Sequence, residues 1–132
     1  MITSEYQSTA ASSGGVLLEG APQQEFLLGQ LDDLYQFRNQ GEVKDYLRRC
    51  DYVIDVLLEA PEQIKSRFGR DAQIVLEVIT DPEDGDRKLF AFILTPLAVE
   101  EAMDRLEKLD EEWWLDASER AEGQLIVDVE LI

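Results

Sequence analysis

The chain has 132 residues, of which 45% are apolar and 31% charged, and its 29 acidic and 12 basic side chains give a formal net charge of −17. This length suits one ordinary domain, and the composition is that of a folded rather than a disordered protein. So negative a protein repels nucleic acid and anionic membrane surfaces and attracts basic proteins or cations. The sequence contains no histidine, which excludes Ser–His and Cys–His nucleophiles and nearly all catalytic zinc sites.

The sequence also indicates where the protein resides. Every apolar run is well short of the roughly 18 residues that a membrane span requires. Met1 is not followed by a basic segment or an apolar secretory region, and Cys50, the single cysteine, cannot form an internal disulfide. We therefore expect a cytoplasmic protein with no membrane association.

The first part of the chain predicts a flexible tail followed by helices. Residues 1–22 are rich in Ser, Thr, Gly and Ala and show no sustained period, whereas residues 23–132 are expected to form a single α+β domain. Helical spacing of apolar residues runs from Gln24 to Phe37, then from Val43 to Cys50, and then from Asp51 to a C-terminal glycine cap at Gly69. Pro61 lies inside the third segment, where it either kinks the helix or starts a new one.

The second half predicts strands and one long helix. The β-branched run at 73–80 and the run at 88–95 flank a turn-rich segment and predict a hairpin. A helix is expected from Ala98 to a stop at Gly123, and a strand over 124–132 with Leu125, Val127, Val129 and Leu131 facing the core.

These elements predict an α+β fold, with N-terminal helices followed by a β-β-α-β unit. We expect a three-stranded, mainly antiparallel sheet covered by helices. In the predicted order 2-1-3, the strand at 73–80 is central, between the strands at 88–95 and 124–132. The two-sided apolarity of residues 73–80 favours that central position.

The chain lacks the glycine-rich loops that bind nucleotide phosphates, so we predict no catalytic residue and no cofactor. The acidic loop residues Asp81, Glu83, Asp84 and Asp86 offer the oxygen ligands that calcium or magnesium prefers. Their spacing does not match an EF-hand, and a solvated hairpin loop is the simpler interpretation. A carboxylate and divalent-metal enzyme remains an alternative.

The segment LDEEWWLDASER, residues 109–120, places two adjacent tryptophans among carboxylates. Helical spacing puts Trp113 on the buried stripe and Trp114 at its edge. Trp114, flanked by acids, is then a candidate anchor for a protein partner, because tryptophan is enriched among the residues that dominate binding energy. The predicted partner-binding residues are Trp114, Asp110, Glu111 and Asp116.

Four segments resemble a family of small acidic bacterial proteins of uncharacterised function, largely from cyanobacteria. They are YQFRNQGEVKDYL, VIDVLLEAPEQIKSRFG, IVLEVITDPEDGDRKLF and DRLEKLDEEWWLD, within roughly residues 31–130. The LDEEWWLD-type signature is the most specific part, and the chain departs from it at Glu107 and Lys108. The resemblance implies a protein encoded in a small two-gene cassette of the toxin–antitoxin kind. It also implies a partner-binding role and no catalytic residue.

We therefore expect a non-enzymatic protein-interaction module that binds a basic protein partner, as an antitoxin-like neutraliser. Between residues 100 and 130 twelve acidic side chains face three basic ones, so the charge is concentrated near the tryptophans. A second alternative is a DNA mimic that occupies a DNA-binding protein. Apolar strand edges also make a homodimer reasonable.

Overall fold

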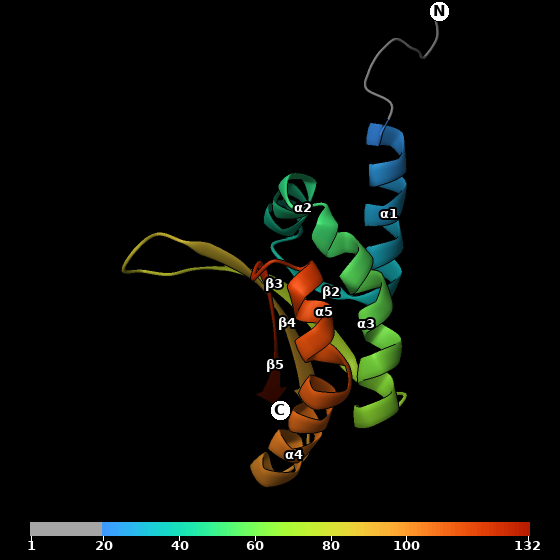
Figure 1. Cartoon of the computed structure of the whole chain (residues 1–132), viewed down its shortest axis with the longest axis vertical. Coiled ribbons are helices and arrows are strands. Elements are labelled where there is room, and N and C mark those ends of the chain that lie inside the picture. Colours follow the sequence, from blue (N-terminus) through green and yellow to red (C-terminus); the bar gives the residue numbers. More distant parts are fainter. Residues whose placement is uncertain (1–19) are drawn as a thin grey trace, which may run out of the picture. The chain divides into compact units, whose positions relative to one another are not determined.

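The computed structural model describes residues 20–132, with side chains from residue 23 onward (Figure 1). The chain divides into two units, Met1–Gln30 and Leu31–Ile132. Helix α1, Gly20–Leu34, begins in the first unit, and its last turn belongs to the second. Most of the predicted tail at 1–22 lies outside the described residues, while Gly20–Pro22 form the start of α1.

The second unit contains the remaining helices and strands. In chain order they are β2 (Gln36–Arg38), α2 (Gln40–Arg49), α3 (Tyr52–Phe68), β3 (Gln73–Thr80), β4 (Arg87–Thr95), α4 (Val99–Leu109), η1 (Asp110–Trp114), α5 (Leu115–Arg120) and β5 (Leu125–Leu131). The predicted mixture of helix and sheet is therefore confirmed. The helices predicted around residues 43–50 and 51–69 and all three predicted strands are also present.

Local chemistry explains where these helices begin and end. Asn39 has φ 59° and its side-chain oxygen accepts a hydrogen bond from the N–H of Glu42, so it caps the start of α2. Gly69 has φ 109° and its N–H donates to Lys65, as expected of a residue that ends α3. Helix α3 continues through Pro61, so the alternative in which a new helix starts there is wrong.

The predicted sheet is wrong in strand number and order. Within residues 20–132 the strands form a four-stranded sheet in the order β2-β3-β4-β5. β3 pairs antiparallel with β4, whereas β2–β3 and β4–β5 are parallel. The expected central position of residues 73–80 is confirmed, but the final strand lies beside β4 instead of β3.

Two physical reasons account for this difference. The segment α4–η1–α5 is long enough to carry the chain back along the sheet, so β5 can pair directly and in parallel with the strand that precedes the crossover. The other side of β3 is occupied by β2, whose one apolar residue, Phe37, was predicted to end the helix at 24–37. A three-residue strand carries almost no periodicity of its own.

The core lies on one face of this sheet. Leu76, Leu89 and Ile93 are completely buried there, as are Leu57 and Ile64 of α3. Helix α2 contacts β3, α4 contacts β5, and α3 packs against α4 and α5. Leu125 and Val127 of β5 face the core as predicted, but Leu131 is 48% exposed because it lies at the end of the edge strand.

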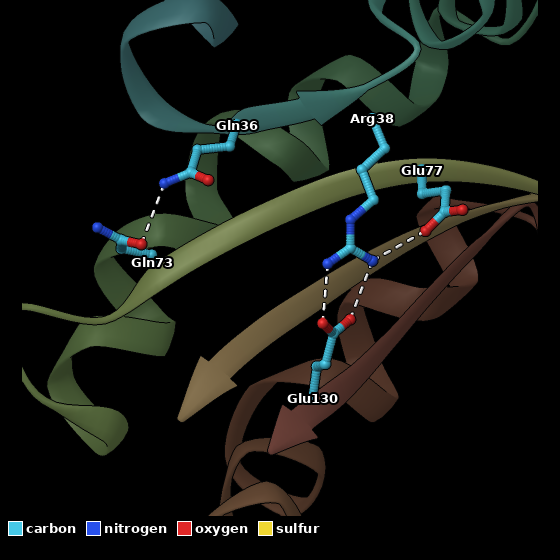
Figure 2. A network of polar contacts seen from close by, with 5 residues as sticks. All are labelled: Gln36, Arg38, Gln73, Glu77 and Glu130. Carbon is cyan, nitrogen blue, oxygen red and sulfur yellow. Dashed lines mark hydrogen bonds and ion pairs between the residues drawn. The ribbon is translucent and has the colours of Figure 1, made fainter. Parts of the chain in front are cut away.

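The opposite face of the sheet carries a polar clamp over aromatic rings. Phe90 and Phe92 stack there with ring centroids 5.3 Å apart. The guanidinium of Arg38 lies 5.8 Å from the Phe92 ring centroid and donates two hydrogen bonds to Glu130, of 2.9 and 2.8 Å, and one to Glu77. Figure 2 shows this clamp in front of the strands, with helices behind them. One side chain of β2 thus ties together both edges of the sheet.

Candidate partner-binding surface

The predicted long helix at 98–123 is interrupted where the tryptophans lie. Residues Asp110–Trp114 form one π-helical turn, η1, between α4 and α5. A π turn accommodates an extra residue, so it rotates the side chains that follow it away from the positions that a regular helix gives them. Trp113, which was predicted to lie on the buried stripe of the helix, is half-buried.

Trp113 is held by side chains from two other helices. Its indole N–H donates a 3.3 Å hydrogen bond to Glu59 of α3. Arg120 of α5 donates two further hydrogen bonds, of 2.7 and 2.9 Å, to the same carboxylate. Hydrogen bonding from Arg120, followed by that from Trp113, lowers the pKa of Glu59. The polar end of Trp113 is therefore already paired within the protein.

The neighbouring residue Glu112 also faces α3. Its carboxylate lies 3.0 Å from the guanidinium of Arg67. The Arg105 guanidinium of α4 donates to the backbone carbonyl of Arg67 and pairs with Glu101. One side of the π turn is thus attached to α3 by Trp113 and Glu112.

Trp114 differs from its neighbour. It is half-buried and its ring contacts that of Trp113, with centroids 5.7 Å apart and planes tilted by 41°. Within the described part of the chain its indole N–H has no hydrogen-bond partner. The next side chain, Leu115, is 64% exposed. An aromatic anchor with a free donor and an exposed leucine beside it suits contact with another protein.

The three acids predicted to surround Trp114 differ in their charged neighbours, because Asp116 interacts electrostatically with Arg120. Asp110, Glu111 and Asp116 form no ion pair with any residue from 20 to 132. Asp110 is partly buried, whereas Glu111 and Asp116 are exposed. The structure therefore places the four predicted residues on one helical stretch. Asp110, Glu111 and Trp114 lie in η1, and Asp116 lies in α5, one turn before the Arg120 that bonds to α3.

Two acids outside the predicted set add to this charge. Burial raises the pKa of Asp110, and the negative charges of Asp128, Glu107 and Glu111 raise it further. Asp128 belongs to the edge strand β5, which α4 contacts. We call Glu107, Asp110, Glu111 and Asp128 the acidic cluster. Because like charges repel, these neighbouring carboxylates disfavour the ionised form of Asp110 in the folded protein.

The acidic loop at 81–86 has a simpler explanation. The side chain of Asp81 accepts a hydrogen bond from the N–H of Glu83, and that of Asp84 accepts one from Asp86, both at 2.8 Å. Gly85 has φ 74°, which a turn here requires. Figure 1 shows this loop, in yellow, projecting beyond the helices. Among the described residues no group of three or more acidic or cysteine side chains is arranged to hold a metal ion.

The sequence pointed to the tryptophans and the nearby acids but not to the contacts that organise them. Glu59 and Arg120 are 61 residues apart, and Asp128 reaches the cluster only through the position of β5. No local pattern reports such contacts. A weak signal did exist, because Asp128 and Glu130 interrupt an otherwise apolar strand.

Across the described residues, no helix combines the length and the apolarity that crossing a membrane would require. A comparison of the chain with protein-family models, curated proteins and solved structures finds no match in any of the three.

Proposed function

We propose that this protein is a non-enzymatic interaction module that binds a basic protein partner through Trp114 and the surrounding acids. One observation supports this proposal most directly: Asp110 and Glu111 beside Trp114 form no ion pair among residues 20–132, whereas the neighbouring Glu112 and Trp113 are both paired with side chains of α3. A charged group without a counter-ion is a ready electrostatic target for a cationic surface. The antitoxin-like role implied by the family resemblance and the cytoplasmic location expected from the composition are consistent with such binding.

Affinity purification of the full chain from its native cells tests this proposal. We expect a stoichiometric protein partner with a basic binding surface, released as the salt concentration rises, because screening weakens charge attraction. The double variant Trp114→Ala with Asp110→Lys should lose that partner. Trp114→Ala with Glu83→Lys is the matched control, because it makes the same charge change on the projecting loop, and it should retain more of the partner.

Two results would contradict the proposal. One is the absence of any stoichiometric partner. The other is equal loss of the partner in the two double variants, since binding would then depend on net charge and Trp114 alone rather than on the acids around Trp114.

A further inference from the structure

Within residues 20–132, no strand pairs with the outer edge of β5, which we call its free edge. Strand β5 is the terminal strand of the sheet and pairs with β4 on its other side. Ile126, Leu131 and Ile132 along it are 36%, 48% and 72% exposed. An unpaired strand edge presents N–H and C=O groups that can pair with another extended segment.

The hydrogen bonds at the two ends of the strand show which groups point outward. The N–H of Ile132 donates to Thr95, and the carbonyl of Gln124 accepts from Leu89, so these even-numbered residues point toward β4. Backbone groups alternate in direction along a strand. The odd-numbered residues therefore turn both their N–H and their C=O toward the free edge; they are Leu125, Val127, Val129 and Leu131.

One of these outward N–H groups already donates a hydrogen bond to a carboxylate. The N–H of Val129 donates a 2.8 Å hydrogen bond to the Asp128 side chain of the same strand. An incoming carbonyl group must displace that carboxylate to reach the N–H. The released carboxylate would need a cation, because Asp128 forms no ion pair among residues 20–132. The edge therefore favours a segment that carries Lys or Arg.

A second copy of this chain fits the edge poorly. Symmetric antiparallel pairing of β5 with itself over its full length sets Asp128 directly opposite Asp128, and Ile126 opposite Glu130. Like charges directly opposite each other destabilise a strand pair, and each copy also carries a net charge of −17.

We propose that the basic partner supplies an extended segment that pairs antiparallel with the free edge of β5. A Lys or Arg side chain of that segment pairs with the Asp128 carboxylate, which frees the N–H of Val129 for the incoming strand. This inference rests on the proposed function, because it names the part of the partner that binds beside the acidic cluster. A partner segment whose side chains alternate between cationic and apolar suits the two faces of β5. Cationic ones would lie on the side of Asp128, and apolar ones on the side of Val129 and Leu131.

A synthetic nine-residue peptide of alternating Lys and Val provides the probe. In antiparallel pairing the valines lie opposite the odd-numbered residues of β5 and direct their amides toward it. N-methylation of the valines therefore blocks pairing, whereas N-methylation of the lysines leaves it intact at the same charge. We expect the valine-methylated peptide to bind about tenfold more weakly or worse, because several hydrogen bonds are lost.

Amide hydrogen exchange gives a readout that charge attraction alone would not produce. Binding of the unmethylated peptide should slow exchange at Val127 and Leu131 and leave Ile126 and Glu130 unchanged. The protein variant Val129→Pro should weaken binding relative to Val129→Ala, because proline removes an outward N–H that β4 does not use. The methylated peptides decide the matter if Val129→Pro fails to fold.

Equal affinity for the two methylated peptides, or binding without slower exchange at Val127 and Leu131, overturns this inference. If such binding still depends on Asp110, the proposed function stands while the added strand does not. If neither a peptide nor a protein partner binds, both proposals fail. Concentration-dependent dimerisation with the same protection pattern and no peptide would instead assign the edge to a second copy.

Discussion

The hydroxyl of Tyr35 donates a 2.6 Å hydrogen bond to the backbone carbonyl of Leu57, the carbonyl that Pro61 leaves without its helical donor. In an α-helix that carbonyl would accept from the N–H four residues later, and proline has none. Tyr35 directly precedes β2, so the bond joins the start of the sheet to the middle of α3. Burial raises the pKa of Tyr35 well above its usual value.

Tyr35→Phe should therefore lower the free energy of unfolding by about 1–3 kcal/mol, the usual effect of leaving a buried acceptor unpaired. Pro61→Ala restores an N–H at position 61, so Tyr35→Phe should cost less in that background. Chemical denaturation of the four proteins in this double-mutant cycle measures the coupling, which we expect to be about 0.5–3 kcal/mol. Additive effects would show that the hydroxyl does not replace the missing donor.

This pair also shows what sequence can and cannot predict. The helix around Pro61 was predicted from the spacing of its apolar residues, which is local information. Whether proline breaks a helix depends on a replacement donor, and Tyr35 lies 22 residues away. Similarly, β2 was missed because Gln36–Arg38 gains its strand conformation from pairing with β3. The π turn at Asp110–Trp114 alters a helix by a single residue and leaves no periodic signal.

The ion pair of Glu59 with Arg120 should make the free energy of unfolding depend on pH in the acidic range. Arg120 holds the pKa of Glu59 below its ordinary value, so the ion pair's contribution is present above the unfolded-state pKa of about 4.3 and is lost as pH falls through the folded-state pKa. Arg120→Ala should lower the melting temperature at pH 7, with a smaller difference near pH 3. Tryptophan emission should shift to longer wavelength, because Trp113 shares Glu59 as a partner.

Arg70→Ala is the matched control for that experiment. Arg70 pairs with Glu62, but both side chains are almost fully solvated, at 74% and 73% exposure. Exposed pairs of this kind contribute little, so neither melting temperature nor emission should change appreciably. Equal effects of the two substitutions would contradict a specific role for Arg120.

Tyr46 should limit stability at alkaline pH. Its hydroxyl contacts the backbone carbonyl of Gln124 at 3.0 Å, the side chain is 5% exposed, and burial is the main cause that raises its pKa to about 12. The folded state therefore favours the protonated phenol. That contribution is complete below pH 10 and is lost as pH rises toward 12. Chemical denaturation should show a steeper loss of stability between these values than in Tyr46→Phe, where Tyr35 and Tyr52 keep their raised pKa values.

The ionised side chain of Asp110 should lower the stability of the folded protein and strengthen its binding to a basic partner. Burial and the charges of Asp128, Glu107 and Glu111 raise its pKa, so its ionised form destabilises the folded state at neutral pH. Asp110→Asn should therefore raise the melting temperature at pH 7. The gain should disappear below the unfolded-state pKa of about 3.9, because Asp110 is then protonated in both states. Glu83→Gln removes one charge from the projecting loop and controls for net charge.

The same Asp110→Asn substitution should weaken binding of the basic partner or of the Lys–Val peptide, as isothermal titration calorimetry would show. If neutralising Asp110 both stabilises the protein and weakens binding, the charge of Asp110 serves the interaction. Selection for stability alone would remove that charge. An unchanged melting temperature relative to Glu83→Gln would show that the acidic cluster does not strain the fold. Unchanged affinity would remove Asp110 from the binding surface and leave Trp114, Glu111, Asp116 and the edge of β5 as its remaining elements.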